Sequence, residues 1–277
     1  MKKLFLLAVC ALVAPLFAAA QEATTVIEKF GDKTIKGVII AGAFDVQLSQ
    51  ADGSSRKVGA KVEILKEVED KLVFELTEEG YVRVAFKNDM TKYFTGSKKK
   101  PQAWITVSEL QYLNVTGASN VVCTGVCSTE GPLRLLTSGN ASVNLLESSA
   151  ETINIEIGGT SDLSDTKLTA TGKTELIQSG TTKMTGTLKT GTAVLTLSGV
   201  AGLTLDGGAE EAVLDVSGTS SADLENFTIG TVNAKVSGMS KVKANVMGGG
   251  TAEVSTMGSF RYKGDGLVTG KGVKRLE

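Results

Sequence analysis

The segment LDVSGTSSA at residues 214–222 returns twenty residues later as AKVSGMSKV at residues 234–242. Both copies place alternating apolar residues before a Ser-Gly pair, and related copies follow one another at intervals of 18 to 22 residues. The pair, or its equivalent, opens at Thr116, Ser138, Gly158, Ser179, Ser198, Ser217, Ser237 and Ser255. A unit of about twenty residues cannot bury its own apolar face, so such units must stack on their neighbours.

Three positions of this repeat form apolar columns. They lie three residues and one residue before the pair and five residues after it, and among them only Thr137 and Gln178 are polar. Alternating apolar residues on both sides of a glycine step predict two short strands that meet at a tight turn. The position three residues after the opening is always small, from Ser119 to Gly258, which predicts a corner with little volume.

These columns predict an all-β protein, a β-solenoid (parallel β-helix) of about eight coils. Because stacked strands lie about 4.8 Å apart, eight coils would form a rod on the order of 40 Å long. A β-propeller needs about 40 residues and four strands per blade, twice the observed period. A β-sandwich gives no reason for the same columns to recur eight times.

The chain divides into three parts. Residues 1–20 have the order of a secretory signal peptide, with Lys2 and Lys3, an apolar run over 4–17 and three alanines at 18–20. The alternatives to a cleaved signal peptide are an uncleaved N-terminal anchor and lipidation at Cys10. Residues 21–112 are expected to form a β-rich N-terminal cap and the first coil, and residues 113–277 the solenoid repeats.

The N-terminal part does not repeat, but strands are predicted at 24–30, 34–40, 44–49, 56–63, 72–76, 81–86 and 103–107. Residues 51–54 and 78–80 are plausible hairpin turns, and residues 64–70 form a helical turn or a charged connection. Val38, Ile40 and Val46 reproduce the column spacing of the repeat. We therefore expect an early coil there, with residues 50–105 as an excursion that caps the open end.

Composition excludes several functions. Signal cleavage removes Lys2 and Lys3, which leaves 27 of the 29 Lys and Arg residues. Together with 30 Asp and Glu they give a net charge of −3. This balance gives no electrostatic reason to expect nucleic acid as a partner. No later stretch approaches 18 apolar residues, so no integral membrane segment is expected after cleavage. The absence of histidine removes the commonest general base and His-containing zinc sites, and no cofactor or metal is expected.

The candidate ligand-binding residues lie in and after a long loop over residues 87–101. They are Tyr93, Lys98, Lys99, Lys100 and Trp104, an aromatic and basic set suited to a sugar or an anionic polymer. The alternative is a solvated loop whose lysines keep a strand edge soluble.

Cys123 and Cys127 remain after signal cleavage, in an oxidising compartment where a disulfide is possible. A bridge requires a turn at Gly125, because extended residues at this spacing place their Cα atoms about 13 Å apart. Cys123 also falls on the inward face, which favours plain buried thiols. Both alternatives stay open.

A polysaccharide lyase or hydrolase is the enzymatic alternative, because its carboxylates could stack on neighbouring coils. The outward column interrupts such a stack, since Asp162 is followed by Lys183, Gly202 and Ser221, and only Asp165 forms a local pair with Asp162. The serine column at the turns is expected to make structural side-chain-to-backbone hydrogen bonds.

The repeated Ser-Gly steps, the opening Ala-Gly-Ala-Phe-Asp-Val at 41–46 and the ending Phe-Arg-Tyr-Lys-Gly at 260–264 resemble a known family. It is the Bacteroidetes-type family of autotransporter adhesin head domains, also called GIN domains. The resemblance implies a right-handed parallel β-helix in the periplasm or on the surface of a Gram-negative bacterium, and it brings no catalytic motif. The resulting prediction is a non-enzymatic, exported, adhesin-like or cell-envelope binding module, with glycans or envelope proteins as partners. A structural envelope protein without a specific ligand is a further alternative.

Overall fold

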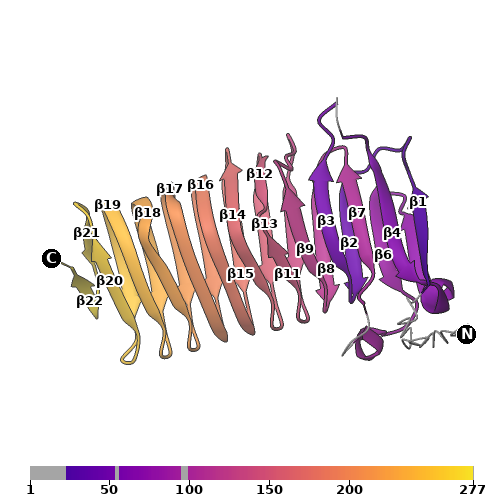
Figure 1. Ribbon diagram of the computed structural model, residues 1–277. Coiled ribbons are helices and arrows are strands. Elements are labelled where there is room, and N and C mark those ends of the chain that lie inside the picture. The colour runs from indigo at the N-terminus through magenta and orange to yellow at the C-terminus, as the bar shows by residue number, and fades with distance from the viewer. Residues whose placement is uncertain (1–22, 54–55, 95–98, 277) are drawn as a thin grey trace, which may run out of the picture.

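The computed structural model describes residues 23–53, 56–94 and 99–276, so the predicted signal peptide lies outside the described residues. The described chain forms an elongated all-β solenoid, with the N-terminal strands at one end and the C-terminal strands at the other (Figure 1). The predicted fold class is confirmed: about eight coils stack at a spacing of about twenty residues.

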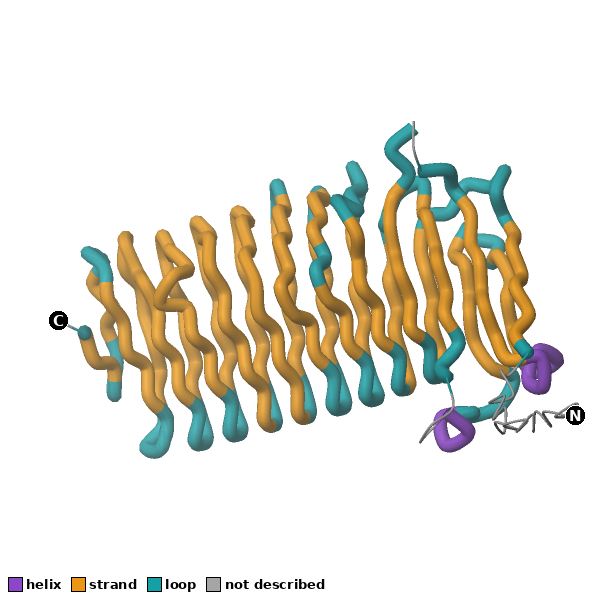
Figure 2. The backbone as a smooth tube through the Cα atoms, in the orientation of Figure 1, coloured by secondary structure: helices purple, strands orange, loops and turns teal. Residues whose placement is uncertain are grey.

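The strands belong to one continuous sheet that folds into two layers, joined by tight turns along one edge of the rod (Figure 2). The first layer contains β6 (Tyr81–Phe86), β2 (Gly37–Gly42), β8 (Tyr112–Gly117), β10 (Leu133–Thr137), β13 (Ile153–Ile157) and β15 (Lys173–Gln178). The second contains β7 (Gln102–Val107), β3 (Asp45–Gln50), β9 (Asn120–Thr124), β11 (Ser142–Asn144), β12 (Glu147–Ala150) and β14 (Asp162–Ala170). Within each layer these strands pair in parallel.

Later coils are built from longer strands that run from the second layer into the first without a break. They are β16 (Thr181–Leu197), β17 (Val200–Val216), β18 (Ser221–Val236) and β19 (Lys241–Val254). The solenoid ends with β20 (Ser259–Lys263), β21 (Leu267–Thr269) and β22 (Val273–Arg275). The two 3₁₀ segments, η1 (Lys66–Lys71) and η2 (Thr91–Phe94), lie outside the coils.

The register follows the predicted columns. Leu113 pairs with Leu135 and Leu135 with Ile155, and Val143 pairs with Leu163 on the other side of the turn. Apart from the half-buried Val254, every residue of the three columns is buried, including the polar Thr137 and Gln178. Burial of this continuous apolar column is the main favourable term for each added coil.

The early coil at residues 37–50 is confirmed. β2 lies between β6 and β8, and β3 lies between β7 and β9. The excursion that leaves after β3 therefore returns twice, as β6 and β7, and stacks on the outer side of this coil. Its remaining strands, β4 (Gly59–Leu65), β5 (Leu72–Leu76) and the preceding β1 (Thr24–Lys29), pair in antiparallel fashion and cover the N-terminal end.

One of the two predicted hairpins is wrong. Residues 51–54 do not join paired strands, because β3 already has β7 and β9 on its two edges and β4 pairs with β1 and β7. The hairpin at 78–80 is confirmed: β5 pairs with β6, and the amide of Thr77 donates to the carbonyl of Tyr81 at 2.9 Å.

A column of glycines occupies the tight turns. Its members are Gly117, Gly139, Gly159, Gly180, Gly199, Gly218 and Gly238, with φ between +67° and +83°. A Cβ on any of them would lie 2.2 to 2.7 Å from the carbonyl oxygen of the glycine one coil earlier. The same carbonyls accept hydrogen bonds from the residue after each glycine, as from Val200 to Gly180 at 2.8 Å. Both the backbone conformation and the close approach therefore require glycine.

Serine hydroxyls support the same turns. Ser198 Oγ donates to the carbonyl of Gln178 at 3.2 Å, and Ser217 Oγ donates to that of Leu197 at 3.3 Å. In the small column, the buried Ser220 Oγ accepts from the amide of Ala201 at 3.4 Å. These are the structural side-chain-to-backbone bonds expected of the serine column.

A corner within the second layer is strained at two non-glycine residues. Leu145 and Asp165 follow the paired residues Asn144 and Ser164 and have φ of 59° and 53°. Leu145 is also 53% exposed. A side chain with a Cβ in this left-handed region costs on the order of 1 kcal/mol, so the stacked coils on either side must hold the corner in place.

The glycine column predicts that Gly199→Ala destabilises the solenoid by about 2–4 kcal/mol, because the new Cβ meets backbone 2.6 Å away at φ +76°. Gly202→Ala is the matched control in the same coil, where a Cβ finds its nearest neighbour at 3.9 Å. Urea unfolding followed by circular dichroism measures both. Equal midpoints for the two variants would contradict this role of the column.

Candidate functional site

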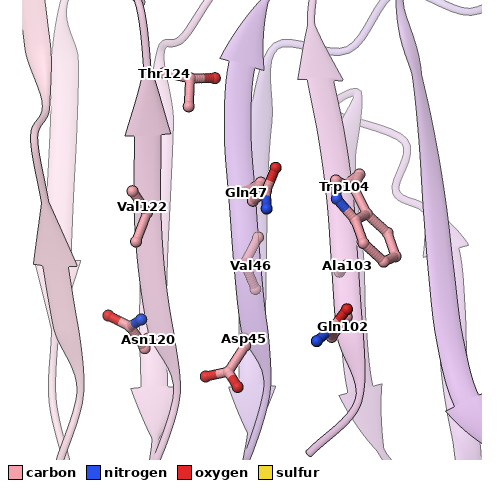
Figure 3. Close-up of a pocket in the computed structure, with 9 residues that line it drawn as sticks. All are labelled: Asp45, Val46, Gln47, Gln102, Ala103, Trp104, Asn120, Val122 and Thr124. Carbon is pink, nitrogen blue, oxygen red and sulfur yellow. The ribbon is translucent and has the colours of Figure 1, made fainter.

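A shallow hollow of about 340 Å³ lies on the outer face of the second layer, over β7, β3 and β9. Figure 3 shows its side chains in rows that cross the three strands. One row is Gln102, Asp45 and Asn120, and the next is Trp104, Gln47 and Val122, as the strand register requires. Val46 and Ala103, which alternate with these residues, are buried in the core and form the floor.

Trp104 borders the hollow on the side of β4. It pairs with Gln47 on one side and with Lys61 on the other, and Lys61 Nζ lies 4.5 Å from the centroid of the indole. This cation–π contact fixes the ring at a partly exposed position. A smaller hollow of about 270 Å³ lies beyond the ring, so the indole stands as a ridge between two depressions.

A polar network extends from the hollow along the rod. Asn120 Oδ1 accepts hydrogen bonds from Ser142 Oγ at 2.7 Å and from Asn144 Nδ2 at 3.0 Å. Asn144 Oδ1 in turn accepts a hydrogen bond from Ser164. These bonds orient the Asn120 amide, so its Nδ2 group is available as a donor toward the hollow.

The loop residues predicted from the sequence do not line this hollow. Tyr93 contacts Glu67 through its hydroxyl and packs edge-on against Phe94, with ring centroids 4.9 Å apart. Lys99 forms an ion pair with Glu63 at 3.0 Å, and Lys100 donates to the carbonyl of Ala118 at 3.1 Å. Lys98 lies outside the described residues. Among the described members of the predicted set, Trp104 alone borders the hollow, and the ligand-binding role of the loop stays a prediction.

A column of aromatic rings anchors that loop to the first coil. Phe94 stacks on Phe86 with centroids 5.5 Å apart, and Phe86 stacks on Phe44 at 4.7 Å. Phe44 and Phe94 are buried. Phe94 of the loop thus serves packing, which the pattern of residue types alone could not distinguish from a role at an open surface.

Asp45, Gln47 and Asn120 were not predicted as site residues. Asn120 stands in the outward polar column, and Asp45 and Gln47 flank the inward Val46 of the early coil. The signal that could have found them is the register: once residues 45–49 stack on residues 120–124, their outward side chains must share one face.

Cys123 and Cys127 are free and buried in the structure. Burial raises the pKa of both thiols, that of Cys127 to about 11 against the opposing effect of the Arg56 guanidinium. Arg56 is held nearby through a hydrogen bond from Nη1 to the carbonyl of Thr124 at 3.2 Å. Such thiols are poor nucleophiles at neutral pH.

Within the described ranges, no three Cys, Asp or Glu side chains gather closely enough to hold a metal ion. In the same ranges, no helix has the length and apolar character needed to cross a membrane.

Comparisons with known proteins place the chain among proteins of the same architecture. Residues 35–266 match the family model described as "Putative auto-transporter adhesin, head GIN domain". A putative adhesin from Parabacteroides merdae superimposes with a TM-score of 0.64 at 14% identity, covering 92% of this chain and 96% of that one. No curated protein matches the sequence.

Two proteins from Parabacteroides distasonis are similar in fold. A putative adhesin gives a TM-score of 0.63 at 16% identity, and a putative lipid binding protein gives 0.62 at 15%. Each likeness covers 92% of this chain and 97% of the other. At these identities the likenesses establish the fold.

In the protein without residues 1–20, which contain Cys10, we expect both remaining thiols to react when it is unfolded without reductant, and neither to react at neutral pH while it is folded. A maleimide or Ellman titration measures this. If no thiol reacts after unfolding, Cys123 and Cys127 are bridged.

Burial raises the pKa of Cys127 from 9.0 to about 11, so the thiol stays neutral in the folded state at a pH where it ionises in the unfolded chain. The free energy of unfolding should therefore fall as pH rises from 9 toward 11.

Proposed function

This chain belongs to the family of putative auto-transporter adhesin head GIN domains, and we propose on that basis that it is an exported, non-enzymatic binding module that recognises glycans on the outer face of the second layer. The observation that carries the proposal is the hollow in which the Trp104 ring stands beside the side-chain amides of Gln47, Gln102 and Asn120.

This combination of groups suits a sugar. The apolar C–H face of a pyranose ring packs on an indole, while its hydroxyls need both donors and acceptors at fixed positions. Side-chain amides provide a donor and an acceptor each, and the Asp45 carboxylate adds acceptors. The hollow is open and shallow, so it can accept part of a long chain without enclosing its ends.

Rigid support favours binding without induced fit. Each of the named side chains projects from a strand that is paired on both edges: β3 and β9 have parallel neighbours, and β7 lies between the parallel β3 and the antiparallel β4. Asn120 is additionally held by Ser142 and Asn144. A site that is already ordered loses little conformational entropy when a ligand binds.

The arrangement of carboxylates supports binding rather than hydrolysis. Glycoside hydrolysis requires two carboxyl groups about 5–10 Å apart across the scissile bond. Among the described residues that line the hollow, Asp45 is the single acidic one. Asp162 and Asp165, the pair named for the enzymatic alternative, lie two coils farther along the rod.

The sequence of residues 1–20 and the adhesin family support export, and the proposal places the module outside the cell, where glycans of other cells or of the surroundings are accessible. The comparisons give no partner for this chain.

Trp104→Ala should weaken glycan binding about tenfold or more, because the stacking surface is lost, whereas Trp104→Phe should keep most of it. Surface plasmon resonance against immobilised cellohexaose, mannohexaose and chitohexaose measures the effect. Asn120→Ala should also weaken binding, and Ser221→Ala provides its matched control in the same outward column, away from the hollow. Unchanged binding by Trp104→Ala, or no binding by the wild type to any of these glycans, would contradict the proposal.

A further inference from the structure

The outer face of the first layer has a hollow of its own, of about 410 Å³. It lies on the other side of the core from Trp104. Tyr81, Tyr112, Arg134 and Asn154 line it from β6, β8, β10 and β13 of this layer, with β2 between the first two. None of these residues belongs to the first site.

Two tyrosines form a stack at one end of this hollow. Gly37 of β2 lies between them in the register, and the rings of Tyr81 and Tyr112 meet above it, 4.9 Å apart and 16° from parallel. A Cβ on Gly37 would lie 2.8 Å from Tyr81 Cδ1 and 2.9 Å from Tyr112 Cβ. The glycine therefore makes the room that the stack needs. Tyr81 covers one face of the Tyr112 ring, and Tyr112 borders the hollow beside Arg134, its register partner on β10.

An ion pair provides hydrogen-bonding groups beside the tyrosines. Arg134 Nη2 donates to Glu156 Oε1 at 2.9 Å, and the two side chains are 54% and 42% exposed. A guanidinium has five N–H donors and a carboxylate has about four acceptor positions, so both retain capacity for neighbouring hydroxyls. Tyr112 is itself fixed by Asn114 Nδ2, which donates to its hydroxyl at 3.2 Å.

The hollow continues along the rod. Glu156 lines a neighbouring depression of about 300 Å³, together with Asn114 and the partly exposed Leu136 and Ile177. The Arg134–Glu156 pair thus separates two depressions on one face, a shape that fits consecutive units of a chain.

The surrounding charges favour a neutral ligand. Glu156 offsets the charge of Arg134, and Glu109 lies close by, where it accepts from Gln111 Nε2 at 2.9 Å. Gln111 also lines the hollow. An anionic ligand would gain little from a guanidinium that already has acidic neighbours.

We propose that this hollow is a second sugar-binding site, specific for a neutral pyranose chain that stacks on Tyr112 and hydrogen-bonds to the Arg134–Glu156 pair. The protein then carries one glycan site on each layer. A rigid rod with sites on opposite faces can connect two glycans, and each connection raises the effective concentration of the other.

Tyr112→Ala and Arg134→Ala are the test variants, with Tyr112→Phe as the conservative control that keeps the ring. Isothermal titration against cellohexaose, mannohexaose and hexagalacturonate is run on each folded variant and on Trp104→Ala. We expect both alanine variants to weaken a neutral hexasaccharide about tenfold at a class of sites that Trp104→Ala leaves intact, and Tyr112→Phe to bind as the wild type does.

The inference is overturned if both alanine variants bind every sugar as the wild type does, or if hexagalacturonate binds this site more tightly than the neutral sugars. Binding lost only in Trp104→Ala would support the first site and reject the second. Binding lost only in the Tyr112 and Arg134 variants would reject the first site and support the second.

Discussion

The close approach of one glycine backbone to the next at the tight turn is the constraint on which this molecule depends. From Gly117 to Gly218, each carbonyl lies where a Cβ of the following coil would otherwise be, and accepts a hydrogen bond from that coil instead. This contact keeps successive coils at strand spacing and in one register. The apolar columns on either side of the turn then stack without interruption, and the outward side chains fall into straight rows.

Straight rows give flat faces, and both candidate sites occur where a face departs from flatness. Each departure involves a strand of the excursion that leaves the first coil after β3. That excursion contributes Trp104 on β7 to one face and Tyr81 on β6 to the other. Residues that cap the N-terminal end of the solenoid therefore also bring the large aromatic rings to its two surfaces. The end of the rod that is least regular in sequence is therefore the end that carries the aromatic side chains of both candidate sites.

The repeat alone was sufficient to predict the coils, their columns and their register, because each position is specified by the same small or apolar residue several times. The early coil was also predictable, since Val38 and Val46 keep the column spacing although the next coil begins some 75 residues later along the chain. The absence of a hairpin at 51–54 could not be predicted, because β4 is kept from pairing with β3 by β7, which returns to that edge from later in the chain.

The same dependence explains why the candidate sites were only partly predicted. Trp104 was predicted as a candidate site residue from its residue type. Gln47 and Gly37 could not be, because their roles at the two hollows depend on strands that pair with them from far along the chain. The packing of Phe94 could not be predicted, because a ring packed on Phe86 and an exposed ring look alike in sequence. Leu145, whose left-handed backbone an apolar residue rarely adopts, gave no sequence signal at all.

Whether these faces ever meet foreign glycans depends on where the rod stands in the cell envelope. Antibody labelling of intact cells, compared with cells whose outer membrane has been permeabilised, answers this directly. We expect intact cells to be labelled as strongly as permeabilised ones, which would place both faces outside the cell. Labelling only after permeabilisation would place the protein in the periplasm and contradict a role in adhesion.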